Sequence, residues 1–594
     1  MIFKKRIARL FLPILLFYFF LWRGPEFLLA SSEIVISVNP SEVKTEDFGQ
    51  LLGGYINTRA NLNPSSKFIL SQEVLINEAR KMFPQPPEFP RHAVMRTQSY
   101  PMLENDYFVI TNAEVEDIIK FCSQAGCDPM FGAVGEGSIQ TINGITGKVF
   151  DYSPSAIKAR VLFVKQKCQQ YFNDNSHCLH WNIGNEPPSP GGSCSFYGNN
   201  LIPTAMRAVK EVIPNAIFHT PELYLDSAKV RDSNETIGEC IARTLNNNSP
   251  DLKIDVFTTH WYPYVCGGNI LGITGESVLK WGGNGGPSYQ KMSYPEDIVK
   301  GMSWLGKYSV TQNSVIGIGE LNPMGNCTND NDSTGRLNLT WGGAFWHLDV
   351  LGIMAKAGIK YSQKHIHVSG GGGQYEAIIF ANGRVYKTPP YYAYRFYSQY
   401  FGYKVVGSQS SDPATLNSHA SLDKDGNLRL LLINKSVPAV SQKARIVLNN
   451  FNASNNGSAY LMKIPTYFES PSGFNPENPS IYSTVENVPV GNSFEYTVPA
   501  YSAVILKIPR DGGPINTITP TSTPVPFVCS CSGNANVLPK SKGNANCDSA
   551  IDALDFNFWL EQFRSGLSQT DCADFDGDGK VDGIDFEYWR RGRF

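Results

Sequence analysis

The sequence predicts an α/β protein: a (β/α)₈ barrel followed by an antiparallel β-sandwich and a small C-terminal domain. Three observations support this prediction. Eight short β-rich runs alternate with longer helix-compatible segments between about residues 48 and 380. After Tyr394 the apolar residues recur with a period of two. The chain has 594 residues, enough for a large barrel and further domains.

The predicted barrel occupies residues 31–395. We expect its strands at residues 50–55, 93–97, 129–134, 180–184, 217–221, 256–260, 315–319 and 360–368. Segments such as 114–125, 155–170 and 201–212 have helical character. The alternative is an open doubly wound sheet, which would need a Gly-rich phosphate loop after its first strand. Residues 51–55 (LLGGY) match such a loop poorly, so the barrel is favoured.

Residues 396–510 predict the sandwich, with strands at 428–433, 444–448, 459–464 and 503–508. The early strand 34–38 needs a partner and is expected to join it. Residues 511–542 include a Thr/Pro-rich stretch without periodicity, which is typical of an extended linker. Residues 543–594 then form the small terminal domain.

Residues 1–30 predict a targeting segment. Four basic residues precede an apolar run over 10–22, which is typical of a secretory signal and short for a membrane span. Because no small residue precedes Leu29-Ala30 at a cleavage position, an uncleaved anchor is the alternative. Secretion agrees with twelve cysteines, an even number that favours disulfides; Cys122 with Cys127 and Cys168 with Cys178 are close enough to pair, although connectivity stays open. A net charge of −2 gives no case for nucleic-acid binding.

Two glutamates stand where barrel enzymes place catalytic groups, at the C-terminal ends of strands. Glu186 follows the fourth strand in WNIGNEP, and Glu320 ends the seventh in IGIGELNP. Strands four and seven lie across the barrel mouth from each other. Cleavage of a glycosidic bond needs two such carboxyl groups, one to protonate the leaving oxygen and one to attack or to activate water.

These motifs resemble clan A of the glycoside hydrolases, in the branch of β-xylosidases, arabinofuranosidases and heparanase-like β-glucuronidases. The resemblance covers residues 34–510 and implies a retaining double displacement without a catalytic cofactor. It implies Glu186 as acid/base, Glu320 as nucleophile and Asn185 as the ligand of the sugar 2-hydroxyl. It also implies that Tyr262, in His260-Trp261-Tyr262-Pro263, and Arg96 contact the nucleophile. We expect His260 and Trp261 of this motif to belong to the substrate-binding residues as well.

Other residues leave alternatives open. Glu136 and Glu222 also end strands and are the spare carboxylates. Aromatic side chains that stack on a sugar or simply pack are Trp261, Tyr262, Tyr264 and Trp341. His365 and His367 alternate on the eighth strand and are expected to share a face, where substrate contact or packing is favoured over zinc binding.

The terminal domain contains a repeated acidic loop. Residues 544–555 (NANCDSAIDALD) recur thirty positions later as residues 574–585 (DFDGDGKVDGID). Oxygen ligands at positions 1, 3, 5, 7, 9 and 12 suit Ca²⁺. The second loop supplies Asp574, Asp576, Asp578, the Lys580 carbonyl, Asp582 and Asp585, and the first supplies Asn544, Asn546, Asp548, Asp552 and Asp555.

The two loops resemble a type I dockerin, in a match that covers residues 543–594. The resemblance implies two structural Ca²⁺ ions and a cohesin-like partner on a scaffold or surface protein. Asn544 and Ser549 depart from the pattern and weaken the expected first site. The leading hypothesis is a secreted retaining glycoside hydrolase with a docking tail. The alternatives are a non-catalytic carbohydrate-binding or adhesion protein and a metal-dependent hydrolase using His365 and His367.

Overall fold

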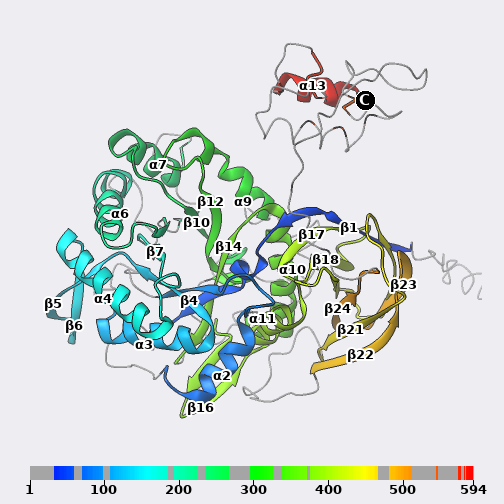
Figure 1. Ribbon diagram of the computed structural model, residues 1–594, viewed down its shortest axis with the longest axis horizontal. Helices are drawn as coiled ribbons and strands as arrows, with labels where there is room; N and C mark the ends of the chain where they lie inside the picture. Colours follow the sequence, from blue (N-terminus) through cyan, green and yellow to red (C-terminus); the bar gives the residue numbers. More distant parts are fainter. Residues whose placement is uncertain are drawn as a thin grey trace, which may run out of the picture. The chain divides into compact units, whose positions relative to one another are not determined.

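The computed structural model of the chain forms two compact units, Met1–Pro514 and Ile515–Phe594 (Figure 1). In the first unit it describes residues 33–58, 70–97, 108–184, 193–220, 223–224, 235–265, 295–325, 338–370, 375–465 and 481–511. In the second it describes residues 544–545, 551, 555, 559, 573–576, 581 and 583–592. Among these residues no helix combines the length and apolarity needed to cross a bilayer.

A closed barrel of eight parallel strands forms the body of the first unit. The strands are β2 (Gly53–Ile56), β3 (Ala93–Thr97), β4 (Cys127–Gly132), β7 (His180–Asn182), β8 (Ile217–His219), β10 (Val256–Trp261), β12 (Val315–Leu321) and β14 (Tyr361–Ser369). They are neighbours in chain order, and β14 pairs with both β12 and β2, which closes the barrel. The predicted (β/α)₈ barrel is confirmed. Its first strand starts later than expected, because residues Phe48–Leu52 form the buried 3₁₀ helix η1.

Helices surround the barrel on the outside (Figure 1). They are α2 (Glu73–Met82), α3 (Asn112–Ala125), α4 (Pro154–Phe172), α5 (Ser193–Ser195), η3 (Phe196–Leu201), α6 (Ile202–Lys210), α7 (Ile237–Asn248), α9 (Pro295–Gly301), η4 (Ser303–Lys307), α10 (Trp341–Ala357) and α11 (Pro389–Tyr400). Local signals fix their ends. Thr111 and Glu114 form a capping box at the start of α3, and Gly126 ends that helix with φ 80°.

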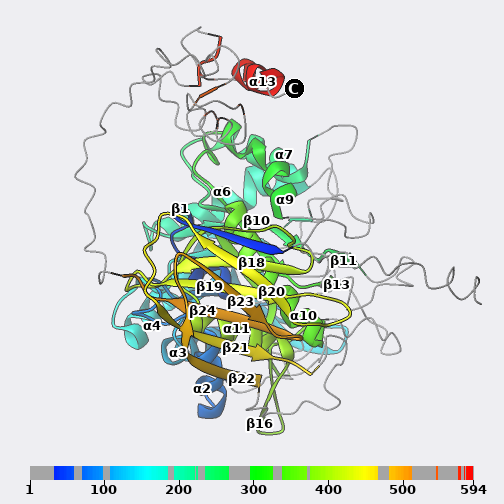
Figure 2. The same cartoon turned by 90° about the vertical axis from the view of Figure 1, so that its right-hand side faces the viewer.

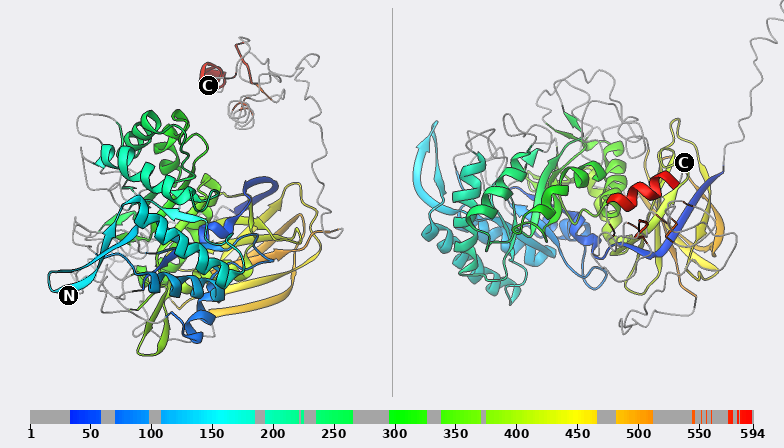
Figure 3. Two further views of the ribbon diagram at one scale, coloured as in Figure 1. Left: turned by 60° about the vertical axis from the view of Figure 1, so that its left-hand side comes forward. Right: turned by 90° about the horizontal axis from the view of Figure 1, so that it is seen from above.

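Further strands follow several barrel strands in the chain, at the C-terminal end of the barrel. After β4, β5 (Gly135–Ile142) and β6 (Ile145–Asp151) form a hairpin that projects from the barrel (Figure 3). After β14, β15 (Ile378–Ala381) pairs with β16 (Arg384–Lys387). The strand β9 (Leu223–Tyr224) pairs with β10, and β11 (Tyr264–Val265) pairs with β13 (Met324–Gly325). The last pair links the segments that follow β10 and β12.

A nine-stranded sheet forms the second layer of this unit (Figure 2). Its strands are β1 (Ile34–Thr45), β17 (Lys404–Ser410), β18 (Leu416–Leu422), β19 (Leu428–Asn434), β20 (Gln442–Leu448), β21 (Asn456–Lys463), β22 (Tyr482–Pro489), β23 (Ser493–Val498) and β24 (Ser502–Ile508). The spatial order is β22-β21-β24-β19-β18-β17-β1-β20-β23, nearly closed on itself. The sheet is mixed rather than wholly antiparallel, because β1 enters from the N-terminal side and runs parallel to β20 and antiparallel to β17.

Helix α10 packs against both the barrel and the nine-stranded sheet and is buried along nearly its whole length. A polar cluster fixes this contact. The buried carboxylate of Asp349 accepts hydrogen bonds from Lys435 at 2.7 Å, His419 at 2.9 Å and Asn417 at 2.6 Å. Because the carboxylate meets both a cation and neutral donors, its burial is compensated. These hydrogen bonds join α10 to β18 and to the residue that follows β19.

Three disulfides brace the barrel: Cys122–Cys127, Cys168–Cys178 and Cys194–Cys240. The first two are the sequence-adjacent pairs expected above. The third joins α5 to α7 and is distant in sequence, so spacing alone could not indicate it. The other six cysteines lie outside the described residues.

Candidate active site and candidate metal centre

The C-terminal ends of three barrel strands bring the predicted nucleophile together with two nitrogen-bearing side chains. Glu320 lies on β12, and His260 on β10 is its partner in the parallel register. Arg96 comes from β3. All three residues are buried, with exposed fractions of 3% for Glu320, 4% for His260 and 2% for Arg96. This convergence follows from the barrel, in which parallel strands present their ends on one rim.

The two carboxylate oxygens of Glu320 have different neighbours. The Tyr262 hydroxyl donates to Oε2 at 2.6 Å, and His260 Nδ1 lies 3.5 Å from the same oxygen. Arg96 Nη1 lies 3.5 Å from Oε1 and donates to the Gly319 carbonyl at 3.2 Å. The sequence-based expectation that Tyr262 and Arg96 contact this carboxylate therefore agrees with the geometry.

The surroundings of Glu320 favour its ionised form. Burial raises the pKa of Glu320. The neighbouring His260, His365 and Arg96 and the Tyr262 hydrogen bond lower it by more, so that the pKa lies below its usual value. Burial also lowers the pKa of His365. The permanent charge of Arg96 and the Tyr262 donor then hold the carboxylate anionic. A buried anion oriented from two sides is suited to act as a nucleophile.

A second ring of side chains supports Arg96. The Arg96 guanidinium lies over the Tyr55 ring, 4.6 Å from its centroid. The Tyr55 ring meets the His365 ring edge to face at 5.2 Å, and His365 lies 5.3 Å from the Tyr375 ring. Sequence reasoning did not single out Tyr55 or Tyr375. For Tyr55 a signal existed, since it stands near the end of a predicted strand, but Tyr375 lies in a loop before β15 whose position only the fold sets.

Several other predicted residues lie elsewhere. Trp261 is 4% exposed and packs against Trp346, because alternation along β10 turns it away from His260. Trp341 is buried against Tyr392 on α11. Both contacts favour packing over sugar stacking.

Glu136 lies at the base of the β5–β6 hairpin, where it pairs with Lys148 and with Arg160 at 3.4 Å. It also accepts a hydrogen bond from the backbone N–H of Asn112. These contacts anchor the hairpin to α4, so Glu136 has a structural role.

The prediction that His365 and His367 share a face is wrong. His365 faces Tyr55 and Tyr375, whereas His367 Nε2 lies 3.1 Å from the Leu52 carbonyl and its ring packs on Tyr394. The cause is an irregularity in the pairing of β14 with β2 between Lys364 and Val368. Within the part of the chain that the structure describes, neither histidine belongs to a group of three metal-ligating side chains.

Four of the predicted positions cannot be placed. Asn185, Glu186 and Glu222 lie outside the described residues, as does the side chain of Tyr264. The described segment that contains β7 ends at Gly184, directly before the Asn-Glu-Pro motif.

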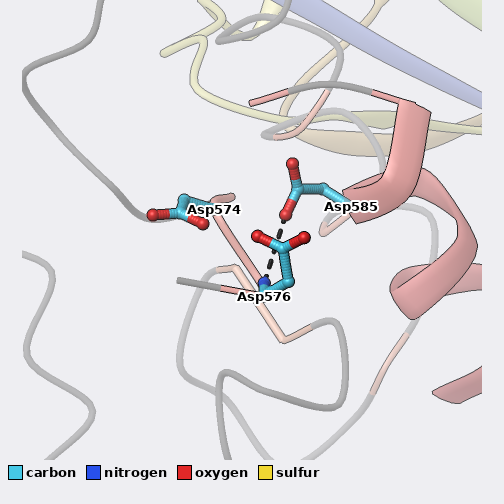
Figure 4. Close-up of side chains that lie close together, drawn as sticks. All are labelled: Asp574, Asp576 and Asp585. Carbon is cyan, nitrogen blue, oxygen red and sulfur yellow. Dashed lines mark hydrogen bonds between the residues drawn. The ribbon is translucent and has the colours of Figure 1, made fainter. Parts of the chain in front are cut away.

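In the second unit, three of the predicted ligands converge. Carboxylate oxygens of Asp574, Asp576 and Asp585 lie within 4.8 Å of one another (Figure 4). Asp585 Oδ1 also accepts the backbone N–H groups of Phe575 at 2.5 Å and Asp576 at 3.3 Å. Such a set of hard oxygen atoms fits a cation like Ca²⁺. The remaining predicted ligands of the second loop, Asp578, Lys580 and Asp582, are outside the described residues.

The first loop repeats one of these hydrogen bonds. Asp555 Oδ1 accepts the backbone N–H of Ala545 at 2.7 Å, which is the bond from Phe575 to Asp585 displaced by thirty positions. The small apolar core contains residues from equivalent positions of the two repeats, thirty positions apart: Ala545 and Phe575, Ile551 and Val581, and Trp559 and Trp589. Helix α13 (Gly583–Gly592) follows the second loop. Asn544 and Asp555 are buried; Asn546, Asp548 and Asp552 are not described.

Comparison with known proteins adds a fold-level result. No family model and no curated protein matches the sequence. Solved structures match over 80% of the chain. The α-L-arabinofuranosidase of Thermotoga maritima, in complex with arabinose, has a TM-score of 0.55 and 14% identity, with 99% of its own chain covered. The family GH51 arabinofuranosidase of Xanthomonas axonopodis pv. citri has a TM-score of 0.56 and 12% identity, with 100% covered.

A xyloglucanase of family GH44 from Paenibacillus polymyxa gives a TM-score of 0.54 and 16% identity, again over 80% of this chain and 99% of that one. Barrel and attached sheet therefore match together, rather than the barrel alone. This chain has the glycoside hydrolase fold of families GH51 and GH44.

Proposed function

We propose that the protein is a retaining glycoside hydrolase with Glu320 as its nucleophile and Glu186 as its acid/base. The observation that carries the proposal is the environment of Glu320: a buried carboxylate at a barrel strand end, oriented by Tyr262 and paired with Arg96. A carboxylate that only made a surface salt bridge would not be 3% exposed beneath two such neighbours. Glu186 enters from its motif after β7.

The proposed reaction has two steps. In the first, a Glu320 oxygen attacks the anomeric carbon as the glycosidic C–O bond breaks, and Glu186 gives its proton to the departing oxygen. The sugar is then held as an ester of Glu320. In the second, Glu186 takes a proton from water, which attacks the same carbon and releases Glu320. Arg96 and Tyr262 would hold the carboxylate in line for attack, and Asn185 would bind the sugar 2-hydroxyl.

The substrates to test first are arabinofuranosides, xylosides and β-glucosides, with glucuronides as a further class. The structurally similar proteins are arabinofuranosidases and a xyloglucanase, which supports plant polysaccharide fragments as candidates. A panel of 4-nitrophenyl glycosides tests the proposal directly. If the protein turned over none of these glycosides and no cell-wall polysaccharide, the result would instead favour a carbohydrate-binding or adhesion protein.

The roles of the two glutamates are tested by substitution. Glu320→Gln should reduce turnover by several orders of magnitude, since an amide cannot form the ester. Glu186→Ala should recover part of its activity with azide on substrates that have good leaving groups. The matched control is Glu136→Gln, which alters another strand-end glutamate and should keep near-parental kcat. If both Glu320→Gln and Glu186→Ala also stayed near parental activity, the assignment would be wrong.

Stereochemistry provides an independent test. Proton NMR of the first-formed product should show the anomeric configuration of the substrate, as a double displacement requires. An inverted anomer would leave Glu320 at most a general base.

We propose further that the protein is secreted and that its tail is a calcium-dependent docking module for a cohesin-like scaffold or surface protein. The Asp574, Asp576 and Asp585 cluster and the thirty-residue repeat of contacts support this proposal. Asp574→Ala combined with Asp585→Ala should remove the tighter of two calcium sites in calorimetry of the full chain, and a chain ending at Pro514 should bind at neither. Activity on small glycosides should not change. Absence of calcium binding to the parent chain would refute the docking proposal.

A further inference from the structure

Lys364 lies on β14, level with Leu321 of β12 and Gly54 of β2 in the parallel registers. It is one strand away from Glu320 and one residue further along. Its side chain is fully buried, with 0% exposed. Lysine is almost never buried to this extent unless it is paired, so its contacts require an explanation.

Two acceptors hold the Lys364 ammonium group. Nζ donates to Asn322 Oδ1 at 2.8 Å and to the Tyr375 carbonyl at 2.6 Å. Glu376, which is 3% exposed, adds negative charge close to it. The Lys364 Nζ therefore connects the end of β12 to the loop that precedes β15.

Asn322 extends the connection back to β14. It is the second residue after Glu320 and is completely buried, and its Nδ2 donates to the His365 carbonyl. Lys364, Asn322 and the His365 backbone thus form a closed triangle between β12 and β14. The triangle sits at the level where the pairing of these strands becomes irregular, between Ile318 and Leu321. Side chains rather than a regular ladder fix the strand end there.

The second acceptor positions a wall of the site. The Tyr375 carbonyl accepts from Lys364 and also from the Ile366 backbone N–H at 3.2 Å. The Tyr375 ring contacts the ring of His365, and the His365 ring also contacts the ring of Tyr55. Tyr55 in turn underlies Arg96, the partner of Glu320. Lys364 therefore reaches Glu320 by two routes, through Asn322 along the strand and through Tyr375 across the ring contacts.

We propose that Lys364 is a positioning residue for the nucleophile: by bridging Asn322 and Tyr375 it fixes the end of β12 and the side chains around Glu320 in the arrangement needed for attack. The inference rests on the proposed function. A displacement of about 1 Å in a reacting group costs up to about 100-fold in rate, so a supporting contact of this kind has a measurable effect.

The test compares two lysines whose side chains donate to oxygen acceptors inside the fold. Lys364→Met removes the bridge but keeps an unbranched side chain that is only one atom shorter. Lys356→Met is the matched control, because Lys356 on α10 is half-buried and donates to two carbonyls, of Ser408 and Ser418, away from Glu320. Both variants should lose thermal stability. Only Lys364→Met should lower kcat, by about 10-fold to 100-fold, with KM changed less than about threefold.

A double-mutant cycle with Asn322→Ala separates positioning from general loosening. Asn322→Ala leaves the ammonium group with the Tyr375 carbonyl and provides a second variant if Lys364→Met does not fold. Because the two residues act through one bridge, the double variant should be little slower than the slower single variant. Parental kcat in Lys364→Met or Asn322→Ala, or strictly additive losses, would overturn the inference. A wild-type enzyme that turns over no glycoside would overturn the proposed function instead.

Discussion

Removing the hydroxyl group of Tyr262 isolates one hydrogen bond to the candidate nucleophile. Tyr262→Phe deletes the 2.6 Å donor to Glu320 Oε2 and leaves Arg96 and His260 in place. A hydrogen bond to a charged group contributes about 1.5–3 kcal/mol. Since about 1.4 kcal/mol corresponds to one pKa unit, the pKa of Glu320 should rise by about 1–2 units.

The direction follows from which form the bond stabilises. The hydroxyl stabilises the carboxylate, so its loss favours the protonated acid, which cannot attack. In the parent enzyme the low pKa of Glu320 places the acid limb of the kcat/KM profile below the usual range for glutamate. In Tyr262→Phe that limb should move to higher pH by the same amount of about 1–2 units, which is the contribution of one hydrogen bond to a charged group.

The assay is the pH dependence of kcat/KM on the best 4-nitrophenyl glycoside of the panel. Tyr391→Phe is the matched control, because its hydroxyl donates to Glu78 Oε2 at 2.7 Å outside the site. That variant should lose stability without moving the acid limb. An acid limb that stays in place in Tyr262→Phe, or moves equally in both variants, would refute the argument that this hydroxyl tunes Glu320.

Two further predictions concern stability. Asp349→Asn leaves the buried Lys435 ammonium group, 2.7 Å from the carboxylate, without its counter-charge, so urea unfolding should show a loss of about 3–5 kcal/mol, whereas the exposed Asp425→Asn should show almost none. Burial lowers the pKa of His180 and of His367 to about 3. Because unfolding lets both rise toward about 6.5, the unfolded state binds more protons below that pH, and the fold should lose about 2 kcal/mol per histidine between pH 7 and pH 5. Equal unfolding free energies at pH 7 and pH 5 would contradict this prediction.

Period and spacing in the sequence determined much of this protein. Alternation of β-rich and helical runs was enough for the barrel, because each strand buried on both faces reads as a short apolar run. The strand-end rule was enough to single out Glu320, since parallel strands of a closed barrel bring their C-terminal ends to one rim. The family resemblance then implied that Tyr262 and Arg96 contact this carboxylate. In the tail, ligand spacing was enough to indicate Asp574, Asp576 and Asp585.

Only the tertiary structure decided the features that depend on contacts between residues far apart in the sequence. The mixed character of the second sheet depends on β1, whose neighbours β17 and β20 are more than 350 residues away. The different surroundings of His365 and His367 depend on a break in strand pairing, which strict alternation does not anticipate. Trp261 was expected at the sugar and packs on Trp346, because a helix distant in sequence covers that face of β10. The role of Lys364 could not be predicted from the sequence, because a single lysine in a strand is usually a surface residue. Only the packing of β12, β14 and the loop that contains Tyr375 shows which groups it contacts.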